Sequence, residues 1–223
     1  MFRHELSYYF STPIAYIVIG LYLLAISLFL WVIPGEWNIL ESGYADCAGL
    51  FSMSPWLLIL LCPALTMRLF CEEKQSGTWD VLLSKRVSVA RIVWSKFFAA
   101  WTITLLAILP CIVHYFVVYS IAEPVGNVDG GAFAGSMTGL VLLSGVFTSL
   151  GLLTAAIGRN QIVCFLLGAV LSFVLYWVTL QDHFASISRG VVDVRDVVFF
   201  CSVGVSAVLL TVFLLGRKQY FCV

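Results

Sequence analysis

Charged residues are scarce in this sequence. They make up 11% of the 223 residues, whereas a soluble domain carries about 25%, and hydrophobic residues make up 61%. A soluble core cannot bury such an excess of apolar side chains, so the composition predicts an integral membrane protein. The 12 basic and 12 acidic residues cancel, and without a basic surplus nothing indicates binding to nucleic acid.

Motifs for nucleotide and metal binding are also missing. No G-x-x-x-x-G-K-[ST] stretch is present to cradle nucleotide phosphates, so any ATP that drives this protein must be bound by another chain. The seven cysteines stand mostly alone in apolar runs, without a C-x-x-C pair or a histidine cluster, which favours small apolar residues over a metal or redox site. We therefore expect no catalytic residue, no metal site and no cofactor bound by this chain.

One short segment offers the elements of a hydrolytic site. Asp182, His183 and Ser186 lie close together, and helical spacing places Asp182 and Ser186 on one face. The same segment carries Phe184 and Ile187 at the spacing of a membrane-surface helix. These residues leave a membrane-embedded hydrolase as one interpretation of the sequence, although the least favoured one.

Six apolar stretches are long enough to cross a membrane as helices, which takes about 20 residues. They lie at about 13–33, 50–70, 97–121, 134–157, 162–180 and 197–216. The first is too long for the apolar part of a signal peptide, and no linker sets off a second unit. We predict an all-α fold in which residues 1–223 form a single transmembrane domain.

Two of the spans have unusual compositions. Pro55 and Pro63 predict a kinked or irregular second span. The fourth span is rich in Gly, Ser and Thr, which predicts a central, closely packed helix or the lining of a polar path.

The N-terminal segment has a pattern of its own. Apolar and aromatic residues recur there at helical spacing, at Phe2, Leu6, Tyr9, Phe10 and Pro13. This favours a helix on the membrane interface, with Arg3 and Glu5 in water, or else a frayed terminus.

Basic residues are distributed unevenly between the two sides of the membrane. Ten lie on one side, namely Arg3, Arg68, Lys74, Lys85, Arg86, Arg91, Lys96, Arg159, Arg217 and Lys218, and two on the other, Arg189 and Arg195. Because Lys and Arg prefer cytoplasmic loops, both termini are expected in the cytoplasm.

His114 is the ionisable residue that lies well inside an apolar stretch, and no Asp, Glu, Lys or Arg lies in the middle of a predicted span. Ion-coupled transporters need carboxylates at depth, so this pattern argues against one. We interpret His114 as a helix-packing or interfacial residue.

The longest polar interruption runs from residue 68 to residue 96. Within it, a short helix is predicted to begin after Gly77, with Thr78 as a candidate N-cap. Trp79, Leu82 and Leu83 then form an apolar stripe on a short predicted helix. Such a stripe either docks in a groove of a partner protein or packs under the chain's own helices.

Three stretches of the sequence resemble one family. The residues Glu72-Glu73-Lys74, Ser76-Gly77-Thr78, Leu82-Leu83 and Val87-Ser88 resemble the motif after the second span of ABC-2 type transporter permeases, although Arg86 replaces a proline of that motif. Residues 10–17 and 183–196 are similar to the start and the outer segment of the subgroup that includes the gliding-motility permease.

The resemblance implies a six-helix permease of the bacterial inner membrane, surrounded by membrane lipids, that works as a homodimer or as a heterodimer with a related permease. A separate ABC ATPase subunit would bind ATP and Mg²⁺ and drive export, in a system related to gliding motility. By position, the ATPase-coupling residues are Glu72, Glu73, Lys74, Gly77, Thr78, Trp79, Leu82 and Leu83. The outer segment before the last span contributes His183, Phe184, Arg189, Gly190 and Asp193. The alternative is a non-transporting scaffold or assembly component of a motility or secretion machine.

Overall fold

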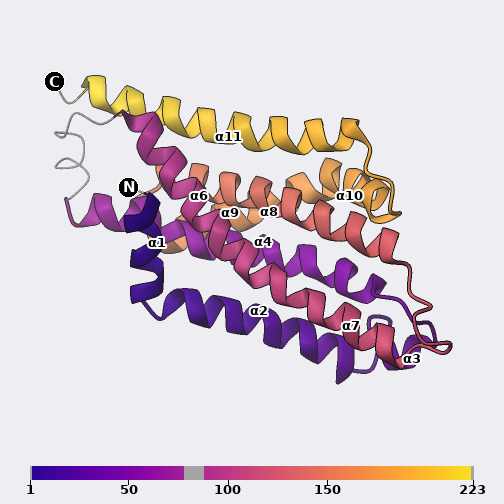
Figure 1. Cartoon of the computed structure of the whole chain (residues 1–223). Helices are drawn as coiled ribbons and strands as arrows, with labels where there is room; N and C mark the ends of the chain where they lie inside the picture. The colour runs from indigo at the N-terminus through magenta and orange to yellow at the C-terminus, as the bar shows by residue number, and fades with distance from the viewer. Residues whose placement is uncertain (1, 78–87, 222–223) are drawn as a thin grey trace.

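Long apolar helices dominate the chain, as a computed structural model that describes residues 2–77 and 88–221 shows (Figure 1). The helices are α1 (Phe2–Ser11), α2 (Ile14–Trp31), α3 (Ile39–Ser42), α4 (Ala48–Gln75), α6 (Val89–Ile108), α7 (Ile112–Ile121), α8 (Gly130–Ile157), α9 (Gln161–Leu175), α10 (Gln181–Ser188) and α11 (Val194–Phe221). A 3-10 turn at Leu109–Cys111 joins α6 to α7, and a π-helical turn at Tyr176–Leu180 joins α9 to α10. The described residues contain no strand, so the predicted all-α class is confirmed.

The helices run side by side as a bundle. Five helical stretches are long and apolar enough to cross a membrane, and α1 with α2, which meet at a bend of 70°, bring the number to six if that pair counts as one span. Figure 1 shows both described chain ends at the same end of the bundle. We call this the terminal end, and we call the opposite end, with the loops at 32–38, 122–129 and 189–193, the far end.

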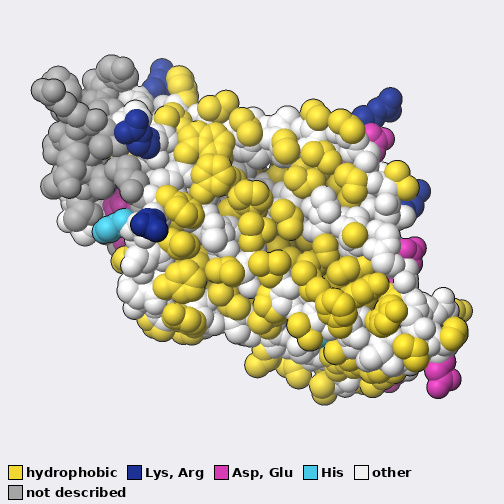
Figure 2. All heavy atoms as spheres, viewed as in Figure 1, with side chains coloured by type: hydrophobic (Ala, Val, Ile, Leu, Met, Phe, Trp, Pro, Cys, Tyr) yellow, Lys and Arg dark blue, Asp and Glu magenta, His cyan; other side chains and the backbone are white. Residues whose placement is uncertain are grey.

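The surface between the two ends is apolar. Figure 2 shows hydrophobic side chains covering most of the middle of the visible face, with charged side chains gathered towards the ends. Many large apolar side chains on α2, α9 and α11 are exposed, among them Leu21, Leu166 and Leu209. Such a belt suits a hydrocarbon environment and not water.

The second span is longer than the apolar pattern suggests. Helix α4 starts at Ala48 and continues through Pro55 and Pro63, so the predicted irregularity does not interrupt it. It ends only at Gln75. The polar interruption predicted to start at residue 68 therefore begins inside a helix, and Glu72, Glu73 and Lys74 occupy the last turns of α4.

Helix α8 is the centre of the bundle, as its small residues predicted. Of its most apolar stretch, 83% is buried inside the protein. A Cβ atom at Gly151 would lie 2.3 Å from Thr66 Oγ1 of α4, and one at Gly135 would lie 2.6 Å from the Ile187 carbonyl oxygen of α10. Both neighbours approach α8 so closely only because glycine leaves the space open.

The packing of α4 against α9 predicts a specific cross-link. Cys71 and Cys164 are buried, with their Sγ atoms 3.0 Å apart. Because a disulfide needs about 2.05 Å, an approach of about 1 Å is enough. Treating the purified protein with iodine should oxidise the two thiols to a disulfide and release two iodide ions and two protons. Mass spectrometry of the non-reduced peptides would detect the bond, Cys71→Ser should abolish it, and a bond from Cys164 to Cys62 instead would contradict the packing.

Candidate functional site

A buried cation joins three helices at the terminal end. The side chain of Lys96, on α6, is only 2% exposed. Its Nζ lies 2.6 Å from Glu73 Oε1 of α4 and 3.2 Å from Glu5 Oε1 of α1. The same ammonium lies 5.5 Å from the centre of the Phe70 ring. We call Glu5, Glu73 and Lys96 the Lys96 cluster.

The Lys96 cluster departs from the sequence-based expectation. Glu5 was expected in water, but its side chain is 19% exposed and contacts Lys96. Lys96 was taken as a residue flanking a span, whereas it lies inside a helix that begins at Val89. A buried ammonium is stable only with opposite charge beside it, and this is why Glu5 faces inward. The signal was present, because Ile92, Val93 and Ala100 form a buried stripe on which Lys96 falls at helical spacing.

Glu72 and the tyrosines of α1 make a second connection between α1 and α4. The Tyr8 hydroxyl donates a hydrogen bond to Glu72 Oε2 at 2.8 Å, and Arg68 Nη1 lies 3.6 Å from Glu72 Oε1. The buried Tyr9 hydroxyl donates to the Leu65 carbonyl oxygen at 2.9 Å. Helix α1 is thus fixed to α4 by specific polar contacts in addition to its aromatic face.

Lys74 connects the end of α4 to the end of α8. Its Nζ donates to three carbonyl oxygens, those of Ala155, Ala156 and Gly158. A positive charge at a helix C-terminus satisfies orphan carbonyl groups and opposes the helix dipole. Gln75 adds a hydrogen bond of 2.8 Å from its Nε2 to the carbonyl oxygen of Arg159, in the turn that follows α8.

The polar segment after α4 begins with a sharp turn. Gly77 has a φ of +70°, in the left-handed region that favours glycine after a helix end. The predicted coupling residues Thr78, Trp79, Leu82 and Leu83, and also Arg86, lie outside the described residues. The chain resumes at Ser88, the N-cap position of α6. Residues 78–87 are therefore held at one end by α4 and at the other by α6, and the Lys96 cluster ties these two helices together.

A polar hollow of about 250 Å³ lies beside the Lys96 cluster. Its lining residues are His4, Glu5, Tyr8, Arg68, Leu69, Glu72, Glu73, Ser76 and Lys96. Among the described lining residues, three carboxylates face two permanent cations, so this part of the lining has a surplus of negative charge.

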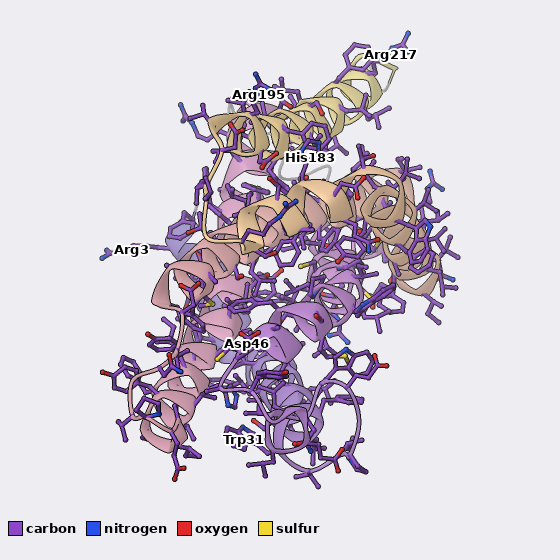
Figure 3. All side chains as sticks on the ribbon, turned by 90° about the vertical axis from the view of Figure 1, so that its right-hand side faces the viewer. Arg3, Trp31, Asp46, His183, Arg195 and Arg217 are labelled. Atoms are coloured by element: carbon purple, nitrogen blue, oxygen red, sulfur yellow. The ribbon has the colours of Figure 1, made fainter. Side chains whose placement is uncertain are left out.

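At the far end, the outer segment links α10 to α11. His183 Nδ1 lies 2.7 Å from Asp196 Oδ1, and the His183 ring stacks on Phe199 with 4.1 Å between centroids. Figure 3 shows His183 between these two helices. Asp196 is buried, and sequence reasoning did not single it out as a partner.

The remaining outer-segment residues have packing and backbone contacts. Phe184 is buried against Gly139 of α8, so the apolar stripe of α10 faces protein as well as the membrane surface. Gly190 has a φ of +88° and its backbone lies close to that of α8. Arg189 Nε donates to the Ala185 carbonyl oxygen at 3.4 Å, and Asp193 Oδ1 accepts from the backbone N–H of Arg195 at 2.9 Å.

The three residues considered as a hydrolytic site do not converge. His183 Nδ1 lies within hydrogen-bond distance of Asp196, and no side-chain hydrogen bond or ion pair between His183 and Asp182 occurs among the described residues. No hydrogen bond joins His183 to Ser186 in the described part of the chain. A nucleophile must lie within hydrogen-bond reach of its base, so this arrangement does not support that interpretation.

His114 has a structural partner. Its Nδ1 accepts a hydrogen bond of 3.1 Å from Trp31 Nε1, which joins α7 to α2. Of the two roles predicted for His114, a helix-packing or an interfacial residue, this contact supports helix packing. Within residues 2–77 and 88–221, no group of three or more His, Cys, Asp or Glu side chains is placed to hold a metal ion.

Comparison with known families gives a match over most of the bundle. The family described as ABC-2 family transporter protein matches residues 38–191, from the residue before α3 to just beyond α10. This range covers more than half of the chain. None of the curated proteins matches the sequence.

The Lys96 cluster predicts unequal effects of removing two basic residues of this region. Lys96→Met leaves two partly buried carboxylates without their counter-charge, which should cost about 3–5 kcal/mol of unfolding free energy. Arg68→Gln breaks a pair whose side chains are 41% and 35% exposed, and this should cost at most about 1 kcal/mol. Denaturant unfolding of the detergent-solubilised protein, followed by tryptophan fluorescence, measures both.

A compensating substitution provides the control. Adding Glu73→Gln to Lys96→Met should recover part of the loss, because one orphaned carboxylate is removed. Equal costs for Lys96→Met and Arg68→Gln, with no recovery in the double variant, would show that the ion pairs do not stabilise this end.

Proposed function

The chain belongs to the ABC-2 transporter family, and starting from this membership we propose that it is the permease subunit of an exporter driven by ATP hydrolysis in a separate ABC ATPase subunit. The chain is a multi-pass membrane protein and a permease component of an ABC transporter. In this proposal it hydrolyses nothing itself and binds no cofactor, since ATP and Mg²⁺ are held by the ATPase.

The proposal rests on the contacts that Glu72, Glu73 and Lys74 make with other helices. Each of these consecutive residues contacts a different part of the bundle: Glu72 contacts α1, Glu73 contacts α6 and Lys74 contacts the C-terminus of α8. They act as positioning residues that make the end of α4 a shared support. In this proposal, a contact of the ATPase with residues 78–87 therefore affects four helices, α1, α4, α6 and α8.

We assign direct contact with the ATPase to Trp79, Leu82 and Leu83, whose sequence spacing forms the apolar stripe. An ATPase can bias the permease only if its ATP-bound and ATP-free states contact this stripe differently. The polar hollow beside Glu72, with its surplus of negative charge, offers a second contact for a basic side chain of the partner.

Further parts of the proposal concern assembly and location. The exposed apolar face of α9, including Leu166, Val170 and Val174, supports pairing with a second copy or a related permease, with lipids covering the rest. The excess of basic residues at the terminal end supports a cytoplasmic position for that end. The membrane in this proposal is the inner membrane of a bacterium. The proposed role in a gliding-motility-related system is supported only by the sequence motifs at residues 10–17 and 183–196.

Coupling is tested by co-expression with the cognate ABC ATPase and purification through a tag on the permease. The wild type should retain the ATPase and stimulate ATP hydrolysis. The triple variant Trp79→Ala, Leu82→Ala, Leu83→Ala should lose at least about tenfold of both, since the apolar anchors that dominate such contacts are gone. Glu72 and Glu73 are left intact because their removal would disturb the packing of α1 and α6.

The matched control replaces three exposed apolar residues of the far end, Leu40→Ala, Val191→Ala and Val192→Ala. This variant should bind and stimulate the ATPase as the wild type does. If the wild type itself retains no ATPase under conditions that preserve such complexes, the scaffold interpretation replaces the exporter.

The orientation is tested with reporter fusions. Alkaline phosphatase, which is active only outside the cytoplasm, should be active when fused after Gly126 and inactive when fused after Arg159. Green fluorescent protein at the same positions should give the opposite pattern. Active phosphatase after Arg159 would reverse the proposed topology.

A further inference from the structure

A cavity of about 370 Å³ opens at the far end, where α4 and α8 begin beside α10. This volume lies within the range of about 300–1,000 Å³ typical of small-molecule sites. Figure 3 looks onto this end and shows Asp46 near its middle, at the start of α4. The lining residues used below are Asp46, Asp129, Phe51, Trp56, Phe133 and Tyr176.

The lining carries acidic groups and no basic side chain among the described residues. Asp46 Oδ1 accepts the backbone N–H of Ala48 at 3.1 Å, and Asp129 Oδ1 accepts those of Gly131 and Ala132 at 2.9 and 3.1 Å. In both carboxylates, Oδ2 makes no hydrogen bond within the described part of the chain. One oxygen of each therefore serves a helix N-terminus and the other is available to a ligand.

The size of the uncompensated charge points to a monovalent cation. Each helix N-terminus contributes about half a positive charge, so two carboxylates at two N-termini leave about one negative charge in total. A divalent metal is not favoured, because no group of three or more metal-ligating side chains occurs in the described residues. The vacant carboxylate oxygens suit a single ammonium group.

Aromatic rings form much of the remaining wall. Phe51 and Phe133 meet edge to face with 5.3 Å between centroids, and Trp56 and Tyr176 do so at 5.7 Å. Ring faces attract ammonium groups, most strongly when these carry alkyl substituents and are weakly hydrated, and the same rings cover apolar ligand surface. A hydrated inorganic cation would gain little from such a wall.

We propose that this cavity binds an organic ammonium compound with an attached apolar group, and that this is the substrate class of the exporter. The role as a substrate rests on the proposed function, whereas the binding itself does not. The ammonium group lies between Asp46 and Asp129, and the apolar group lies against Trp56 and its aromatic neighbours.

The test uses the full-length permease, purified without any ATPase, and phenyltrimethylammonium as the probe, with binding measured by equilibrium dialysis. Asp46→Asn and Asp129→Asn remove charge but keep a side-chain oxygen that can accept the same backbone N–H groups, so the helices are retained. Each variant should bind the probe several-fold more weakly, and the double variant at least about tenfold more weakly. Trp56→Leu should weaken binding several-fold through loss of the ring.

Asp193→Asn is the matched control. Asp193 also accepts a backbone N–H at a helix start of the far end, but it does not line the cavity. This variant should bind the probe as the wild type does. The neutral isostere tert-butylbenzene should fail to displace the probe at concentrations where unlabelled phenyltrimethylammonium displaces it fully.

Three results would overturn the proposal: unchanged binding in the double variant, equal weakening by Asp193→Asn, or displacement by sodium as effective as displacement by the unlabelled probe. The outcomes also separate the two hypotheses. If the probe does not bind but the protein still stimulates the ATPase, the proposed ligand class is wrong and the exporter hypothesis stands. If the probe binds specifically but no ATPase associates, the binding site is supported and the exporter hypothesis is wrong.

Discussion

The ammonium of Lys96 is the charge on which the terminal end depends. A cation with a side chain 2% exposed is tolerated only when carboxylates approach it, and Glu5 and Glu73 do so from two other helices. This requirement fixes the position of α1, because Glu5 reaches Lys96 only when α1 packs directly against α6. It also fixes how the end of α4 faces α6, because Glu73 and Lys96 join these two helices.

The constraint extends to the centre of the bundle through the next residue. Lys74 donates to three carbonyl oxygens at the C-terminus of α8, where a helix leaves its last carbonyl groups without intrahelical partners. Glu73 and Lys74, adjacent in the sequence, thereby attach α4 to α6 on one side and to α8 on the other.

The sequence alone predicted the all-α membrane class, because a run of about 20 uncharged residues has few other uses in a protein. It also predicted the central place of α8 from its small residues, and the packing role of His114. It failed where a contact joins distant segments. Glu5 and Lys96 lie far apart in the chain, and no local pattern shows that they meet, even though Lys96 falls on a buried stripe. The end of α4 was misjudged for the same reason, since charged residues that would end a solitary apolar helix extend this one when partners satisfy them. The pairing of His183 with Asp196 likewise depends on how α10 returns towards α11.

The two ends of the molecule are joined by the same two helices. Helix α4 begins next to Asp46 at the far-end cavity and ends at Gln75, and α8 begins after Asp129 and ends beside Lys74. Each has 28 residues, which at about 1.5 Å per residue makes a rod of about 42 Å. Gly151 of α8 lies directly against Thr66 and Pro63 of α4, so the rods are in close contact along their length. Whatever changes the angle between them at the terminal end must change the space between Asp46 and Asp129 at the other. If the far-end cavity binds the proposed ammonium compound, linkage works in both directions, because a ligand that favours one arrangement of the terminal end is itself favoured by that arrangement.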